Sequence, residues 1–156
     1  MTSDKLAFVA FEPRNGQFVA FLSMEGLLLG ETDPELVLRE AANVYQRSIT
    51  RLSFLIAEIQ TWRARRKLIP ARQVWHVGDS IFELTSGLEK LSLQIDGLYD
   101  HLARDLGAKR KWLEKAIILR RYLPDEESIP RSLNWGRCEK GTRRVAERLR
   151  AGLPPR

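Results

Sequence analysis

The chain has few of the residues that most often carry catalytic or metal chemistry. Its 156 residues include one cysteine, Cys138, and two histidines, His76 and His101. A single cysteine excludes a disulfide within the chain and favours a reducing compartment. One cysteine and two histidines do not provide the ligand spacing of a zinc site. We therefore expect no metal and no cofactor.

Motifs of the common enzyme classes are also missing. Gly26 and Gly30 lack the lysine and the surrounding residues of a phosphate-binding loop. His76 and Asp79 lie close together in sequence, but no serine or cysteine nucleophile motif accompanies them. We therefore expect a protein that is not an enzyme.

Long apolar runs are absent as well. The longest apolar stretches, such as residues 6–11, are far too short to cross a bilayer. The first four residues lack the basic start and apolar run of a signal peptide. These features predict a cytoplasmic protein that does not associate with a membrane.

Positive charge is plentiful, and it is concentrated in the last third of the chain. Residues 1–107 contain 12 Lys/Arg and 14 Asp/Glu, a net charge of −2, whereas residues 108–156 contain 14 Lys/Arg and 6 Asp/Glu, a net charge of +8. This asymmetry favours a polyanionic partner, with nucleic acid ahead of an anionic membrane. A basic surface that serves only solubility is the alternative.

The N-terminal residues 1–30 predict a β-hairpin followed by an apolar connector. The tetrapeptide Phe-Val-Ala-Phe occurs at 8–11 and again at 18–21, and Asn15-Gly16 between them suits a tight turn. Two strands alone are marginal in water, and these are apolar on both faces. The hairpin over residues 6–23 should therefore pack on a helix or on the hairpin of another chain.

Residues 34–66 predict one helix of about 30 residues, roughly 45 Å long. Asp33 and Pro34 are typical of a helix start, and neither proline nor glycine recurs before Pro70. Apolar or small residues recur every three or four positions, at Val37, Ala41, Val44, Ser48, Leu52, Leu55, Ile59 and Trp62. A helix of this length either crosses the domain or pairs with a copy of itself. A homodimer through this helix or through the hairpin is therefore an open alternative. The cations at residues 63–67 suit the negative end of the helix dipole without any ligand.

The rest of the chain predicts shorter helices. One covers residues 70–89, and its apolar face consists of Val74, Val77, Ile81, Leu84, Leu88 and Leu91. A break of this helix at Gly78 or Gly87 is an alternative. Others cover residues 91–106, 108–122 and 141–149, with a loop at 124–130. The predicted fold is mainly α with an N-terminal β-hairpin (α+β), a helical core over 31–123 and a basic segment over 124–156. Residues 152–156 predict a disordered tail.

Residues 97–117 predict two short helices joined at Gly107, with the second helix opening on three consecutive cations. Ala103 lies four positions before this glycine, and apolar residues on both sides can close the corner. The segment resembles the helix-turn-helix superfamily, in which the second helix lies in a DNA groove. The resemblance makes the following residues the core of the motif: Leu102, Ala103, Leu106, Gly107, Leu113, Ala116 and Ile117.

The same resemblance assigns Lys109, Arg110, Lys111 and Lys115 to the surface that faces the groove and the phosphates. It makes Glu114 an acceptor for a cytosine amino group or a partner of a neighbouring cation. Trp112 should pack at the corner or against sugar and phosphate. The match has one departure, because Ala108 and Lys109 cannot cap the second helix as the usual Ser or Thr does.

Further cations extend the predicted nucleic-acid-binding surface toward the C-terminus. They are Arg120, Arg121, Arg137, Lys140, Arg143, Arg144 and Arg148. The loops at 134–137 and 141–144 should present backbone amides and guanidinium groups to phosphates. Trp135, between them, is expected to be a core residue.

Together these features predict a non-catalytic protein that binds nucleic acid, with duplex DNA favoured and RNA as a further option. Two alternatives stay open. One is a helical subunit that contacts nucleic acid within a larger ribonucleoprotein or bacterial defence complex. The other is a protein–protein interaction module that uses the hairpin and the long helix.

Overall fold

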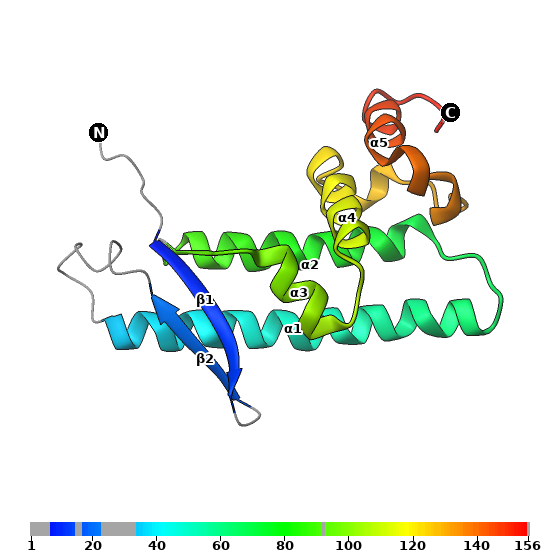
Figure 1. Ribbon diagram of the computed structural model, residues 1–156. Helices are drawn as coiled ribbons and strands as arrows, with labels where there is room; N and C mark the ends of the chain where they lie inside the picture. The colour runs from blue at the N-terminus through cyan, green and yellow to red at the C-terminus, as the bar shows by residue number, and fades with distance from the viewer. Residues whose placement is uncertain (1–6, 15–16, 23–33, 92, 156) are drawn as a thin grey trace, which may run out of the picture.

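The computed structural model describes residues 7–14, 17–22, 34–91 and 93–155, and this part of the chain is mainly helical (Figure 1). Its α-helices are α1 (Pro34–Ala64), α2 (Ala71–Glu89), α3 (Leu98–Leu106), α4 (Arg110–Tyr122) and α5 (Thr142–Arg150). Its strands are β1 (Ala7–Arg14), β2 (Gln17–Leu22) and β3 (Leu93–Ile95). The prediction of a mainly helical protein is confirmed.

The backbone of β1 runs antiparallel to β2, with Arg14 opposite Gln17, and parallel to β3, with Val9 opposite Ile95. The packing role predicted for the hairpin depends on side chains outside the described residues, so it stays a prediction. The connector at 26–30 and the cap at Asp33 also lie outside the described residues.

Helix α1 is 31 residues long, which confirms the predicted long helix. Its buried face is rotated from the predicted one. Ala41, Leu52 and Ile59 are buried as expected, but Trp62 is 36% exposed and Tyr45 is fully buried. A tyrosine can occupy this core position because its hydroxyl donates a hydrogen bond to Asp105 Oδ2, 2.5 Å away, on α3.

Helix α2 lies beside α1 and buries the apolar face that the sequence predicts, from Val74 to Leu88. Neither glycine breaks it. A Cβ on Gly78 would lie 2.1 Å from the backbone oxygen of Ala116, so this glycine lets the backbone of α4 approach α2 closely. A glycine that weakens a helix in isolation is here required by tertiary packing.

The predicted helix over residues 91–106 is wrong in its first half. Leu93 and Ile95 are buried on one side of strand β3, Gln94 between them is exposed, and α3 begins only at Leu98. Gly97 stands between the two elements with φ 62°, a left-handed conformation that ends the strand and opens the helix. The apolar periodicity of this short segment fits a strand as well as a helix.

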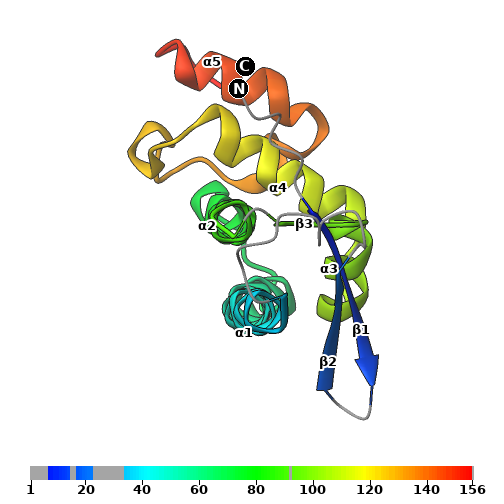
Figure 2. The same cartoon turned by 90° about the vertical axis from the view of Figure 1, so that its left-hand side faces the viewer.

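The helices form successive layers. Figure 2 shows α2 between α1 and α4, and α5 on the far side of α4. The segment after α4 carries short 3₁₀ turns at Glu126–Ser128, Trp135–Arg137 and Glu139–Gly141 before α5. Trp135 and Cys138 are buried in the same core as the long helices, which confirms Trp135 as a core residue.

The segment after α5 folds back on the last turn of that helix, and its expected disorder stays a prediction. Gly152 takes a left-handed conformation, φ 74°, and Leu153 N donates to Arg148 O at 2.8 Å. Arg148 Nε also donates to Pro154 O at 2.6 Å. Glycine at this position closes the end of α5 in the manner of a helix C-cap.

In the part of the chain that the structure describes, no helix combines the length and the apolar character that crossing a membrane requires.

Candidate nucleic-acid interface

The corner between α3 and α4 has the local geometry that the sequence predicts. Gly107 ends α3 with φ 62°, and the Ala108 amide donates to Ala103 O at 3.1 Å, so the predicted left-handed turn is confirmed. Helix α4 begins at Arg110, and Lys109 provides no side-chain cap. The first backbone amides of α4 therefore lie close to three cations, Lys109, Arg110 and Lys111.

The predicted core residues of the motif close this corner. Leu102, Leu113, Ala116 and Ile117 are buried, and Ala103 and Leu106 are half-buried. Many helical hairpins have the same pattern, so the resemblance to the helix-turn-helix superfamily stays a prediction.

Helix α4 is covered along much of its length. It packs against α2 on one side and α5 on another. Of its residues, only Arg110, Lys111 and Arg121 are exposed. The N-terminal end of α4, which carries two of these three residues, is therefore its most open part.

Two of the predicted binding residues are held by acidic side chains of the protein itself. Arg110 Nη1 lies 2.9 Å from Asp100 Oδ1, and its Nε lies 3.0 Å from Glu114 Oε1. These contacts, with the hydrogen bond to Glu114 first, raise the pKa of the Arg110 guanidinium. Glu114 thus pairs with a neighbouring cation, the second of the two roles predicted for it.

Arg120 is the other residue held in this way. Its Nε lies 2.8 Å from Asp79 Oδ1, both side chains are mostly buried, and its guanidinium stacks 4.1 Å from the centre of the Phe82 ring. It joins α4 to α2 and does not point freely into solvent.

Among the C-terminal cations, some contact groups of the protein itself and others are exposed. Arg143 Nε donates to the Tyr122 hydroxyl at 2.6 Å, which raises the pKa of Arg143, and Arg148 contacts the backbone of the C-terminal segment. The remaining predicted cations are exposed and form no ion pair within the described residues: Arg121, Arg137, Lys140 and Arg144.

The loops expected to present backbone amides to phosphates use several of them internally. Trp135 N donates to Ile69 O at 2.7 Å, Cys138 N to Trp135 O at 2.8 Å, and Gly141 N to Cys138 O at 3.2 Å. The first bond fastens the C-terminal segment to the residues just before α2, and the other two close local turns. These three amides are therefore engaged within the protein, because buried backbone groups must find partners as the segment joins the core.

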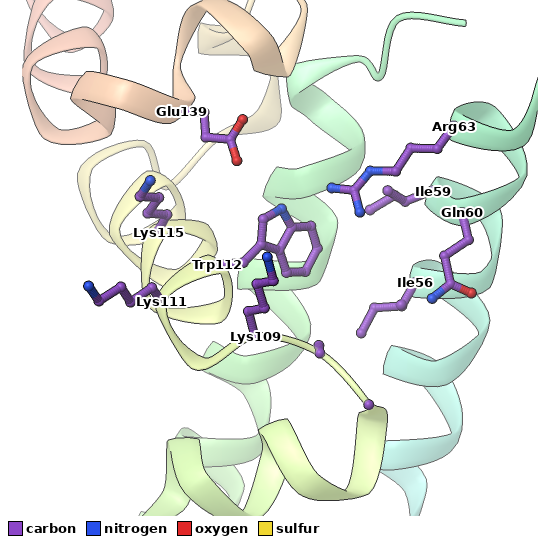
Figure 3. A pocket seen from close by; sticks show the side chains of 11 residues that line it. Ile56, Ile59, Gln60, Arg63, Lys109, Lys111, Trp112, Lys115 and Glu139 are labelled. Atoms are coloured by element: carbon purple, nitrogen blue, oxygen red, sulfur yellow. The ribbon is translucent and has the colours of Figure 1, made fainter. Parts of the chain in front are cut away.

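The structure brings the remaining lysines of α4 together with a residue from a distant part of the sequence. Lys109, Lys111 and Lys115 line a pocket of about 340 Å³, and Arg63 from the last turn of α1 lines its opposite side (Figure 3). None of these four cations forms an ion pair with a described residue. Sequence reasoning missed Arg63, since it assigned residues 63–67 to the helix dipole alone.

The inner wall of this pocket is apolar and aromatic. Ile56 and Ile59 come from the buried face of α1, and the Trp112 ring stands between α1 and α4. Trp112 is half-buried, and its Nε1 is shielded from solvent without a hydrogen-bond partner within the described residues. Figure 3 shows the nitrogen edge of this ring on the side of Glu139, the one carboxylate that lines the pocket. We name this site the basic pocket.

Within the described residues, no group of three or more His, Cys, Asp or Glu side chains could hold a metal ion. Comparison of the chain with protein-family models, with curated proteins and with solved structures gives no significant match. Its function is therefore inferred from the geometry and chemistry of its own residues.

Proposed function

We propose that this chain is a non-catalytic nucleic-acid-binding protein that contacts the phosphates of duplex DNA where the end of α1 meets the start of α4. The observation that carries the proposal is the convergence of Arg63, Lys109, Lys111 and Lys115 on one open pocket. These cations come from segments almost fifty positions apart in sequence, yet they line the same pocket.

Uncompensated cations in one place favour a polyanion for a simple physical reason. Like charges that share a pocket repel one another, and a phosphate group relieves that repulsion. Binding also releases the counterions condensed on nucleic acid, which strengthens association at low salt. The first turn of α4 adds to this, because no side chain caps its amides and its dipole favours an anion.

The exposed part of α4 is compatible with a helix-turn-helix mode of binding. In that mode the N-terminal residues of the second helix contact the bases. Lys109 and Lys111 lie at that end, whereas the flanks of α4 are covered by α2 and α5. The proposal therefore uses the start of α4, with Lys140 and Arg144 as further phosphate contacts.

The test compares two double variants that remove the same charge. Lys109→Gln with Lys111→Gln should weaken duplex binding and reduce the slope of log K against log salt by about one unit for each lost phosphate contact. The control is Arg39→Gln with Lys90→Gln, two exposed cations that do not line the basic pocket. Anisotropy titrations at several salt concentrations supply both quantities. Equal affinities and slopes for the two variants contradict the proposal.

The same titrations, run with single-stranded DNA, RNA and duplex DNA, show which kind of nucleic acid the protein prefers. Tighter binding of single-stranded DNA or RNA than of duplex DNA points to a subunit of a ribonucleoprotein or bacterial defence complex, in which basic helices line a strand.

One observation favours the interaction-module alternative. Helix α1 exposes Leu36 and Phe54, at 51% and 65% of their surface, and apolar residues on a long helix can pair with another helix. Light scattering coupled to size-exclusion chromatography distinguishes a homodimer through this helix from a monomer. A dimer without nucleic-acid binding at low salt supports that alternative.

A further inference from the structure

The walls of the basic pocket differ in chemistry, and together they restrict what fits inside. The α4 lysines line one side and Arg63 lines the opposite side, and the inner wall is formed by Ile56, Ile59 and the Trp112 ring. Glu139 is the one carboxylate among the lining residues. A ligand that uses all three features carries an anionic group, a flat ring and a hydrogen-bond donor.

The size of the pocket sets the scale of that ligand. Its volume of about 340 Å³ lies near the lower end of the range of about 300–1,000 Å³ found for small-molecule pockets. A simple inorganic anion would leave the aromatic and apolar wall in contact with water. A long stretch of duplex cannot enter a space of this size.

We infer that the basic pocket binds one nucleoside phosphate unit. This inference rests on the proposed function and names the part of the nucleic acid that the pocket takes. The phosphate lies among the cations, the base stacks on the Trp112 ring, and Glu139 accepts a hydrogen bond from a sugar hydroxyl or a base N–H. The same chemistry comes from two sources, the 5′-phosphorylated end of a strand and a free mononucleotide.

Figure 3 supports this division of roles. The Arg63 guanidinium extends from α1 toward the Trp112 ring, and the Lys109 side chain lies along the near edge of that ring. A base stacked on the indole therefore has a cation close to either end. Stacking of one base on an aromatic side chain is a sequence-tolerant contact, because every base has a π face.

The experiment measures the affinity of the full chain for a short oligothymidylate, labelled at its 3′ end, that carries either a 5′-phosphate or a 5′-hydroxyl. We expect the 5′-phosphate to bind about tenfold tighter. Arg63→Gln, in the exposed last turn of α1, should abolish this preference, and so should Trp112→Leu. Trp112→Phe keeps an aromatic ring and should retain part of the preference. Arg39→Gln with Lys90→Gln should leave it unchanged.

Competition identifies the source of the ligand. Displacement by free dTMP supports a pocket that accepts mononucleotides, and a retained 5′-phosphate preference without displacement by dTMP supports a strand end.

Three results overturn the inference: no 5′-phosphate preference together with no effect of dTMP, a preference that survives in both Arg63→Gln and Trp112→Leu, or displacement by inorganic phosphate as efficient as by dTMP. Duplex binding that still depends on Lys109 and Lys111 would leave the proposed function standing in each of these cases.

Discussion

Replacement of Gly78 by alanine tests the closest approach of two helices in this fold. The new Cβ would lie 2.1 Å from the Ala116 oxygen and 2.7 Å from its carbonyl carbon, whereas ordinary contact begins at 3.4 Å. Both atoms belong to the backbone of α4, so no side chain can rotate away. Helices α2 and α4 would have to separate along their whole shared seam.

The expected magnitude follows from two opposing terms. Overpacking in a core costs about 1–3 kcal/mol, and a clash with backbone belongs at the upper end of that range. Alanine in place of glycine inside a helix stabilises by about 1 kcal/mol. The net loss of unfolding free energy should be about 2 kcal/mol, which for a protein of this size corresponds to a fall in Tm of about 4–8 °C.

Gly87 in the same helix is the matched control. A Cβ there would meet the Val44 side chain at 3.1 Å, and that side chain is only half-buried and can shift. Gly87→Ala should therefore remain within about 1 kcal/mol of the parent protein. Urea unfolding followed by circular dichroism and tryptophan fluorescence measures both variants. A Gly78→Ala protein as stable as Gly87→Ala would refute the close-packing explanation.

Two further predictions concern buried groups. Burial raises the pKa of the Cys138 thiol to about 11, so iodoacetamide should modify it in denaturant but not in the folded protein at neutral pH; prompt modification of the folded protein would contradict its placement. Tyr45→Phe should lower stability by about 1–3 kcal/mol in urea titrations, because the Asp105 carboxylate loses its phenolic donor. Burial, followed by this hydrogen bond, raises the pKa of Tyr45 above its usual value of about 10, so only the unfolded chain ionises this group readily and its contribution is lost as pH rises past about 10. The alkaline loss of stability should be smaller in Tyr45→Phe, and an identical pH dependence in the two proteins would rule out this role.

Local signals predicted most of the helices correctly. The start of α2 after Pro70 and the left-handed turn at Gly107 follow from the backbone preferences of proline and glycine, which act within a few residues. The length of α1 follows from a long stretch without either residue. Strand β3 was missed because three residues carry too short a pattern to separate a strand from a helix.

The candidate site depends on contacts between distant segments, which local sequence signals do not predict. The sequence alone placed Lys109, Lys111 and Lys115 on one helix and placed the positive charge in the last third of the chain. It did not show that Arg110 would be held by acidic neighbours, or that Arg63 would lie across a pocket from the α4 lysines.

The sequence by itself thus determined the helical class, the main helix boundaries and the basic character of the C-terminal third, because these depend on composition and on periodicity within single segments. Only the tertiary structure decided which cations are paired and which face the basic pocket, because that depends on how distant segments pack. Gly78 illustrates the difference. In the sequence it is a residue that weakens a helix, and in the fold it permits the α2–α4 crossing that helps to position α4 beside the end of α1.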